Sequence, residues 1–242
     1  FFMLRAVIKM SERRAAFVSS VTHELRTPLT TFRLYSDMLS SGLVKEPGIQ
    51  QKYLETLRTE SERLTHLVEN VLAYSQIERG GVSANKSEEL SLGVLIERVS
   101  ERLDTRAHEA GMKLQVHMTE LDSGRKLLVN TTAVEQILFN LVDNAAKYAC
   151  EGGSVITLTA EFQKNNLRIA VCDQGQGICR RERGRLFKPF HKTAEQAAST
   201  KPGVGLGLAL CRRLARAMKG DLVYEKTDQG SCFVLKVPSE LK

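Results

Sequence analysis

The sequence predicts an α + α/β protein: an antiparallel helical hairpin that forms a dimeric four-helix bundle, followed by an α/β sandwich. Two observations carry this prediction. Apolar residues recur at heptad spacing through the N-terminal third, which is typical of bundle helices. Beyond Gly80-Gly81 the pattern changes to helix and strand segments in succession, which is typical of layered α/β domains. We assign residues 1–80 to the hairpin, 81–89 to a linker and 90–242 to the sandwich.

Two long helices are expected in the first domain, at residues 4–41 and 49–78, separated by the helix breakers Pro47 and Gly48. The apolar stripe of the first helix contains Leu4, Val18, Leu25, Phe32 and Leu39. The stripe of the second contains Tyr53, Leu57, Leu64, Leu67 and Val71. A single hairpin buries such stripes poorly, whereas two copies make a four-helix bundle, so we expect a homodimer.

The second domain is expected to begin with a helix at 92–110 and a strand at 112–118, followed by a short apolar run at 127–129. A capping box of Thr132 and Glu135 predicts the start of a helix that runs to residue 149. The remaining expected elements are strands at 155–162 and 167–172, a loop-rich stretch at 173–202, a helix from about Gly205, and strands at 222–225 and 232–237. Strands with helices on one side indicate a sandwich.

Composition narrows the range of partners. The net charge is +7, but the cations are dispersed and aromatic residues make up only 6%, so we expect no nucleic-acid partner. No run of 18 apolar residues occurs, so we expect no membrane contact in this segment. The five cysteines lack metal-ligand spacing, which indicates small buried residues that stay reduced in the cytoplasm. Because the chain begins with Phe1 rather than methionine, an upstream membrane or sensor segment is expected.

His23 is the first candidate catalytic residue. At about 100° per residue it falls roughly opposite the apolar stripe of its helix, so its imidazole is expected to face water. A solvated, near-neutral imidazole is a competent nucleophile for a phosphoryl group. Glu24 is adjacent, Thr27 lies one helical turn on, and Pro28 is expected to bend the helix. For a lone histidine, a surface position without any chemistry is the more common interpretation.

Four polar residues share one face of the helix that ends near residue 149. Asn140 and Asn144 offer carboxamide oxygens, which can coordinate magnesium. Lys147 can reach phosphate oxygens, and Tyr148 can lie against a base. A polar surface stripe without function would look the same, so this segment alone leaves both interpretations open.

Two glycine-rich segments follow. Asp173-Gln174-Gly175-Gln176-Gly177 comes directly after an apolar strand; its carboxylate can accept from an exocyclic amine, and its glycines allow backbone to approach a purine. Gly203-Val204-Gly205-Leu206-Gly207-Leu208 opens a helix, whose exposed N–H groups can bind phosphate. Each segment alone could be an ordinary turn, but their order after the asparagine helix is far more specific.

Together these segments resemble those of bacterial sensor histidine kinases, in the same order and over nearly the whole chain. His23 to Leu29 resembles the histidine box, Asn140 to Tyr148 the asparagine box, and Asp173 to Gly177 the first glycine box. Leu186 to Phe190 resembles the phenylalanine box, and Gly203 to Leu208 the second glycine box. The resemblance implies a dimerisation and phosphoacceptor domain joined to an ATP-binding domain of the histidine kinase, gyrase and chaperone type.

The resemblance also implies ATP and magnesium as cofactors. Asp173 is then expected to hydrogen-bond the adenine amine, and Asn144 to be the principal magnesium ligand. Asn140 and Lys147 are expected to help with the metal and the phosphates. The other implied nucleotide contacts are Tyr148, Gly175, Gly177, Ile178, Phe190, Lys192, Gly203, Gly205, Leu206, Gly207 and Leu208. Residues 178–202 are expected to form a lid.

The implied reaction passes the γ-phosphoryl group to His23, with Glu24 as the base, and then to an aspartate of a response-regulator receiver domain. Thr27 completes an acid-x-x-threonine pattern that implies phosphatase activity toward that regulator. Two positions depart from the family. Lys192 stands where an arginine is frequent and loses its bidentate fork, and Asn130-Thr131 replaces an aspartate-proline pair but can still cap a helix.

Two other functions are alternatives at this stage. An ATPase of the gyrase, chaperone or mismatch-repair type would share the sandwich but carries a glutamate where Asn140 stands, so rapid hydrolysis is not expected here. A catalytically idle dimeric scaffold would dock partners without needing the intact nucleotide segments.

Overall fold

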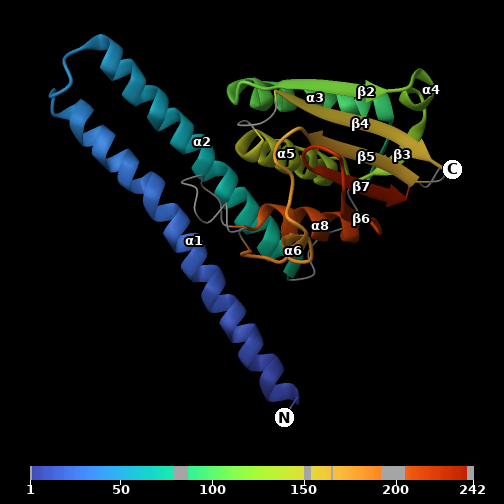
Figure 1. Ribbon diagram of the computed structural model, residues 1–242. Helices are drawn as coiled ribbons and strands as arrows, with labels where there is room; N and C mark the ends of the chain where they lie inside the picture. The colour runs from blue at the N-terminus through green and yellow to red at the C-terminus, as the bar shows by residue number, and fades with distance from the viewer. Residues whose placement is uncertain (1, 79–86, 150–153, 165, 192–204, 239–242) are drawn as a thin grey trace.

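The computed structural model of the protein describes residues 2–78, 87–149, 154–164, 166–191 and 205–238. A long helical hairpin and an α/β sandwich are evident in Figure 1, with the sandwich lying against the second helix of the hairpin. The hairpin consists of α1 (Phe2–Ser40) and α2 (Pro47–Glu78). Its turn contains Gly42, whose φ of +68° suits a residue without a Cβ. Both predicted helices are confirmed.

Apolar side chains along the hairpin are only partly covered. Tyr35 of α1 stacks on Tyr53 of α2 with ring centroids 4.5 Å apart, which joins the helices near their turn. Val18, Leu54 and Leu72 are nevertheless 60%, 52% and 56% exposed. None of the helices in the described ranges carries an apolar stretch long enough to cross a bilayer.

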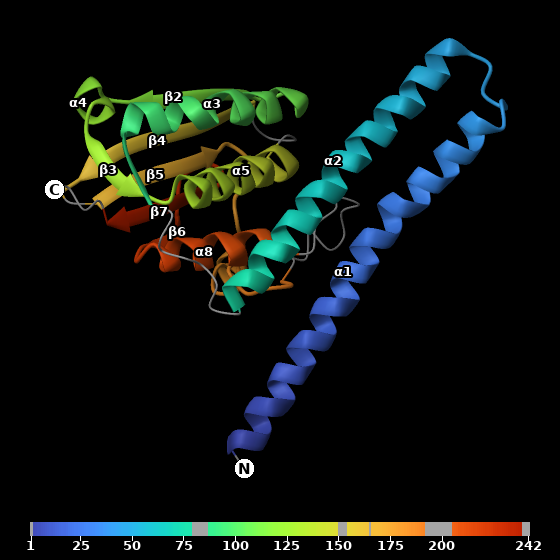
Figure 2. The same cartoon turned by 180° about the vertical axis from the view of Figure 1, so that it is seen from behind.

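The sandwich contains a five-stranded sheet in the order β2-β4-β5-β7-β6. Its strands are β2 (Lys113–Met118), β4 (Val155–Gln163), β5 (Asn166–Asp173), β6 (Asp221–Glu225) and β7 (Cys232–Pro238). β2 and β4 are parallel, and the other neighbours are antiparallel. In Figure 2, α3 (Leu92–Glu109), α5 (Thr131–Tyr148) and α8 (Gly207–Ala217) all lie on one face of the sheet. The predicted sandwich with helices on one side is confirmed.

Side chains between the helices and the inner face of the sheet make the main core. Leu95, Ile137, Leu158, Ile169 and Leu210 are completely or almost completely buried there. Burial of such side chains stabilises the domain by roughly 1.5–3 kcal/mol each. Four residues of α2 (Leu67, Val71, Ala73 and Tyr74) and Val21 of α1 pack in the same core. The hairpin is therefore docked onto the sandwich along α2.

The start of α5 corrects one expectation. The helix begins at Thr131, and its N-cap is Asn130, whose Oδ1 accepts the N–H of Ala133 at 3.0 Å. The predicted capping box of Thr132 and Glu135 is therefore wrong. Asn130 lies in extended backbone (φ −76°, ψ 95°), so its carboxamide satisfies a first-turn donor before Thr132 can act as the cap.

Three short elements with polar composition, one strand and two helices, were not predicted from the sequence. β1 (Glu88–Ser91) pairs antiparallel with β3 (Lys126–Val129), and its first two residues fall in the range 81–89 that was expected to be a linker. Glu88 of β1 forms an ion pair at 2.6 Å with Arg98 of α3. Two four-residue helices, α4 (Glu120–Ser123) and α6 (Arg180–Arg183), occupy predicted loops.

The cysteines give a second correction. Cys172 and Cys232 form a disulfide, whereas the sequence pattern indicated reduced, unpaired thiols. They are 60 residues apart in the chain, and only the register of β5 with β7 places them opposite each other. Cys211 is buried and Cys179 is exposed, both as free thiols, and Cys150 lies outside the described residues.

Candidate functional site

The C-terminal half of α5 meets the start of α8 at one end of the sandwich. A Cβ on Gly207 would lie 3.2 Å from Asn140 Oδ1 and 4.0 Å from Asn144 Nδ2, so both carboxamides approach the first residue of α8. Leu206, the N-cap residue, makes no side-chain cap with the described first turn of α8. A helix N-terminus with uncapped N–H groups favours bound phosphate, and nearby carboxamide oxygens favour magnesium. The residues present thus fit both groups.

Asn140 is held by the hairpin as well as by its own helix. It is 8% exposed, and its Nδ2 donates to Gln136 O at 2.9 Å and to Asn70 Oδ1 at 3.4 Å. Its Oδ1 accepts from Asn70 Nδ2 at 3.5 Å. One turn further along α2, Tyr74 lies beneath the guanidinium of Arg213, 4.4 Å from its ring centroid. These contacts place α2 beside the phosphate end of the candidate site.

Lys147 and Tyr148 are the last two residues of α5. Lys147 Nζ is paired with Asp143, which also accepts from Arg106 Nε at 2.9 Å, so a phosphate must compete for this lysine. Burial, together with the nearby carboxylates of Asp143 and Glu24, raises the pKa of the Tyr148 hydroxyl to about 12. Val21, two residues before His23 in α1, packs in part against the core of the sandwich.

Asp173 is positioned at the end of β5 by two backbone donors. Its Oδ1 accepts the N–H of Gly175 at 2.9 Å and that of Ser231 at 3.1 Å. Its Oδ2 accepts no hydrogen bond from the described residues. Burial raises the pKa of this carboxyl, and the two N–H donors offset part of that rise. One carboxylate oxygen is therefore held in place while the other is available to an exocyclic amine.

Glycines let the glycine-rich segments approach neighbouring backbone. A Cβ on Gly175 would lie 2.9 Å from Ala149 Cα, so the Asp173 turn contacts the end of α5 directly. Gly205 has a φ of +70°, and its carbonyl accepts the N–H of Phe190 at 3.0 Å. Gly177 also has positive φ, at +76°. The phenylalanine and second glycine segments are thus joined at the base of the predicted lid.

The remaining predicted contacts divide into two groups. Leu206 is buried, and Ile178, Phe190 and Leu208 pack in part against the core. These four side chains therefore support the site by packing. Lys192, Gly203 and the second part of the predicted lid, residues 192–202, lie outside the described residues. Asn70 and Ser231 were missed by sequence analysis because both are ordinary polar residues whose partners are distant in the chain. The turn Gln229-Gly230-Ser231 before the last strand was the one available signal for Ser231.

The phosphoacceptor segment lies in the middle of α1. The backbone of His23 belongs to this helix, while its side chain lies outside the described residues. Glu24 is half-buried, whereas Thr27 is exposed. The Thr27 hydroxyl makes no hydrogen bond to the described residues, although its carbonyl accepts from Thr31 Oγ1 at 3.3 Å. α1 continues through Pro28, which is buried.

Comparison with known protein families agrees with this arrangement. Residues 13–80 match the family described as the His Kinase A (phospho-acceptor) domain. Residues 129–241 match the family described as histidine kinase-, DNA gyrase B- and HSP90-like ATPase. Sensor protein SrrB of Staphylococcus aureus is 26% identical over 230 residues, which cover 95% of this chain and 39% of SrrB. The chain thus spans about two fifths of the length of this curated relative.

Solved structures of histidine kinases share the fold. AdeS of Acinetobacter baumannii superposes with a TM-score of 0.67 at 26% identity, covering 90% of this chain and 98% of AdeS. ShkA, solved with AMPPNP, gives 0.63 at 26% identity, covering 93% of this chain and 46% of ShkA. The chain belongs to the family of bacterial sensor histidine kinases, and its second domain is of the ATP-binding class.

Proposed function

We propose that this protein is an ATP-dependent protein-histidine kinase that phosphorylates His23 and then passes the phosphoryl group to an aspartate of a response-regulator receiver domain. The observation that carries the proposal is the docking of the hairpin against the candidate nucleotide site: Asn70 of α2 exchanges hydrogen bonds with Asn140 of α5. Val21, two residues before His23, packs in part against the core of the sandwich, which supports a transfer between the acceptor segment and the nucleotide site.

Each part of the site has a role in this proposal. The free Oδ2 of Asp173 accepts from the adenine amine, and the N-terminus of α8 binds the phosphates. Asn144 and Asn140 would hold magnesium, which when bound neutralises phosphate charge. Glu24 orients and polarises the imidazole of His23 as a base. Catalysis is then mostly a matter of positioning and charge.

Two findings support the nucleotide and the regulator as partners. The similar structure of ShkA contains AMPPNP, an ATP analogue. The histidine kinase ThkA was solved in complex with the response regulator protein TrrA, and it superposes with a TM-score of 0.67 at 23% identity, covering 99% of this chain and 66% of ThkA. The complex of ThkA supports a response regulator as the proposed partner of this chain.

Labelled ATP tests the proposed function against both alternatives. With γ-labelled ATP and magnesium, we expect acid-labile, base-stable label on the protein, as phosphohistidine. Release of free phosphate without label on the protein would instead indicate an ATPase, and neither product would indicate a scaffold. Asn140 offers no carboxylate to activate water, which disfavours rapid hydrolysis.

We further propose that Thr27 gives the protein phosphatase activity toward the phosphorylated regulator. Its exposed hydroxyl has no partner among the described residues, so it can orient a water toward a phosphoaspartate. Thr27→Ala is expected to leave labelling of His23 within about twofold and to slow regulator dephosphorylation by about a hundredfold, which is the lower end of the range for a lost proton-transfer group. The rate is measured on purified labelled regulator. Equal rates in wild type and variant would leave Thr27 with a structural role only.

We also propose that the protein is a homodimer formed by its hairpins. Val68 and Leu72 of α2 are 46% and 56% exposed, a surface that a second hairpin would cover. The double substitution Val68→Glu and Leu72→Glu is expected to convert the dimer to a monomer, measured by sedimentation equilibrium. Leu121→Glu is the matched control, since Leu121 is 87% exposed in α4 on the sandwich and should not affect assembly. A monomeric wild type would contradict the proposal.

A further inference from the structure

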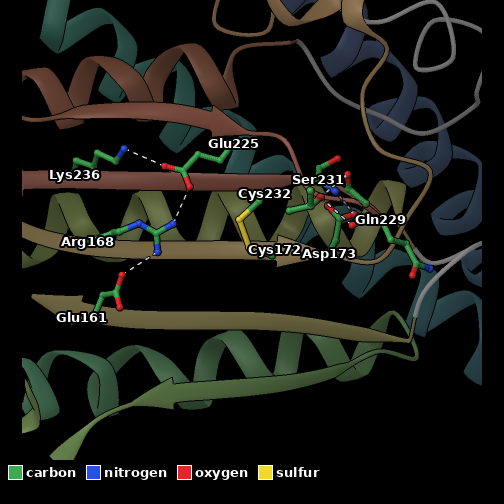
Figure 3. Close-up of a disulfide and its surroundings, with 11 residues drawn as sticks. Glu161, Arg168, Cys172, Asp173, Glu225, Gln229, Ser231, Cys232 and Lys236 are labelled. Atoms are coloured by element: carbon green, nitrogen blue, oxygen red, sulfur yellow. Dashed lines mark hydrogen bonds and ion pairs between the residues drawn. A yellow bond between two sulfur atoms is a disulfide. The ribbon is translucent and has the colours of Figure 1, made fainter. Parts of the chain in front are cut away.

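We propose that Cys172 and Cys232 are a thiol–disulfide exchange site through which dithiol reductants weaken nucleotide binding. The inference rests on the proposed nucleotide site, because the two cysteines adjoin it. Cys172 immediately precedes Asp173 at the end of β5, and Cys232 immediately follows Ser231 at the start of β7. Figure 3 shows the disulfide bridging the two strands next to Asp173 and Ser231.

The two residues beside the disulfide hold the adenine-binding carboxylate. Asp173 N donates to Ser231 O at 2.8 Å, and Ser231 N donates to Asp173 Oδ1 at 3.1 Å. Gly230 adopts a φ of +80°, and its backbone lies so close to Asp173 that a Cβ would overlap the Asp173 carbonyl. The position of the carboxylate therefore depends on the separation of the two strand ends.

Other ties between the two turns are weak. The Thr227 hydroxyl donates to the carbonyls of Gln229 and Gly230, which stay within the same turn. Across the turns, exposed Gln229 Nε2 reaches Gln174 O at 3.4 Å, at the long end of hydrogen-bond geometry. Beyond the strand pairing itself, the disulfide is the strongest link between these turns in the described part of the chain. Breaking it removes the covalent constraint one residue from Asp173.

A reductant can reach the pair. The cysteines lie in a small cluster with Ala170, Val223 and Val234 that is separate from the main core. Side chains alternate along a strand, so this cluster is on the face of the sheet opposite the helices. Cys232 is 4% exposed, whereas Cys172 is half-buried, so we propose that the reductant approaches from the side of Cys172. An ATP-dependent kinase works where thiol reductants are abundant, and disulfides in such compartments are usually transient or regulatory.

The exchange is a two-electron reduction. One thiolate of the dithiol attacks Cys172 Sγ, the sulfur–sulfur bond breaks, and Cys232 leaves as a thiolate that takes a proton. The second thiol of the reagent then displaces Cys172, which leaves as a thiolate and also takes a proton. The dithiol becomes a disulfide, having lost two electrons and two protons to the protein.

Reduction is expected to weaken adenine nucleotide binding. Once the covalent link is broken, backbone pairing alone holds the two strand ends together, so we expect the hydrogen bonds around Asp173 to loosen. We expect the oxidised protein to bind ADP at least about fivefold more tightly than the reduced protein, the lower range of coupling between linked sites. Coupling is reciprocal, so ADP should make the disulfide harder to reduce by the same factor, or about 20 mV in midpoint potential.

The experiment uses the full chain with Cys150→Ser and Cys179→Ser, which leaves buried Cys211 as the one cysteine besides the pair. The Kd of a fluorescent ADP analogue is measured after treatment with oxidised glutathione and again after dithiothreitol. Differential alkylation and intact mass establish the state of the pair. Adding Cys172→Ser provides the control: it cannot form the disulfide and should bind with the reduced-state Kd under both conditions.

Each outcome is decisive. Tighter binding by the oxidised pair, lost in the Cys172→Ser control and matched by the potential shift with ADP, supports the proposal. Equal or tighter binding by the reduced protein, or failure of the pair to oxidise, overturns it while leaving the kinase assignment standing. Absence of nucleotide binding in both states would overturn the nucleotide site itself, and this proposal with it.

Discussion

Replacement of His23 by glutamine is expected to reduce protein phosphorylation by at least about a thousandfold, because it removes the nucleophile that accepts the phosphoryl group. Nucleotide affinity is expected to stay within about twofold of wild type, because every proposed nucleotide contact lies in the sandwich and the asparagine helix. Phosphorylation is measured as acid-labile label from γ-labelled ATP, and affinity as the Kd of a fluorescent nucleotide.

His117→Gln is the matched control for this substitution. His117 is exposed on β2, at the edge of the sheet away from the candidate site. The His117→Gln protein should therefore be phosphorylated at the wild-type rate. Acid-labile label retained by His23→Gln would show that another residue is the acceptor. A loss of label accompanied by a large loss of nucleotide affinity would point to a folding defect instead.

Replacement of Asp173 by asparagine is expected to have the opposite signature, a loss of nucleotide affinity of about 10- to 100-fold. This range corresponds to one hydrogen bond to a charged group, roughly 1.5–3 kcal/mol. An asparagine oxygen can still accept the N–H groups of Gly175 and Ser231, which now fix Oδ1. Its amide then occupies the place of the free Oδ2 and presents a donor toward the adenine amine, where an acceptor is needed.

The same substitution should not destabilise the fold. Burial raises the pKa of Asp173, so the folded protein favours the neutral carboxyl more than the unfolded chain does. The stability from this residue is therefore present at low pH and is lost as pH rises through the folded pKa. At pH 7 the neutral asparagine avoids that cost, and the Tm of Asp173→Asn should equal or exceed wild type. A clearly lower Tm would indicate that the carboxylate is structural.

The raised pKa also predicts how binding depends on pH. Adenine recognition needs the ionised Asp173, which is protonated at a higher pH than an exposed aspartate would be. As the pH is lowered, the affinity of the wild type for ADP is expected to fall at a higher pH than the one at which exposed carboxylates become protonated. The affinity of Asp173→Asn should show no such fall in that pH range. Isothermal titration with ADP over a pH series measures both, and parallel curves would contradict the role of Asp173.

The chain encodes most elements of this fold in local patterns. The heptad stripes place α1 and α2, and short apolar segments place β4, β5 and β7, because period and burial are set by neighbouring residues. The polar strand β1 escaped detection because its pairing with β3, rather than its composition, makes it a strand. The start of α5 was predicted wrongly because Asn130 and Thr132 are both residue types that can cap a helix, and the backbone geometry decides between them.

The candidate site was likewise predictable only in part. Asn140, Asn144 and Asp173 were identified because their residue types, order and glycine context specify phosphate and purine chemistry. Asn70 and Ser231 were not, because a polar residue on a helix or in a turn carries no local sign of a partner 58 or 70 residues away.

The sequence by itself determined the fold class and most of the elements, and it predicted the acceptor histidine segment and the residue types of the proposed nucleotide site. Only the tertiary structure decided which distant residues meet: Asn70 with Asn140, Ser231 with Asp173, and Cys172 with Cys232. The reason is physical. Local periodicity determines which face of a helix or strand is buried, whereas strand register and domain docking depend on packing the whole core at once, and these determine the long-range pairs.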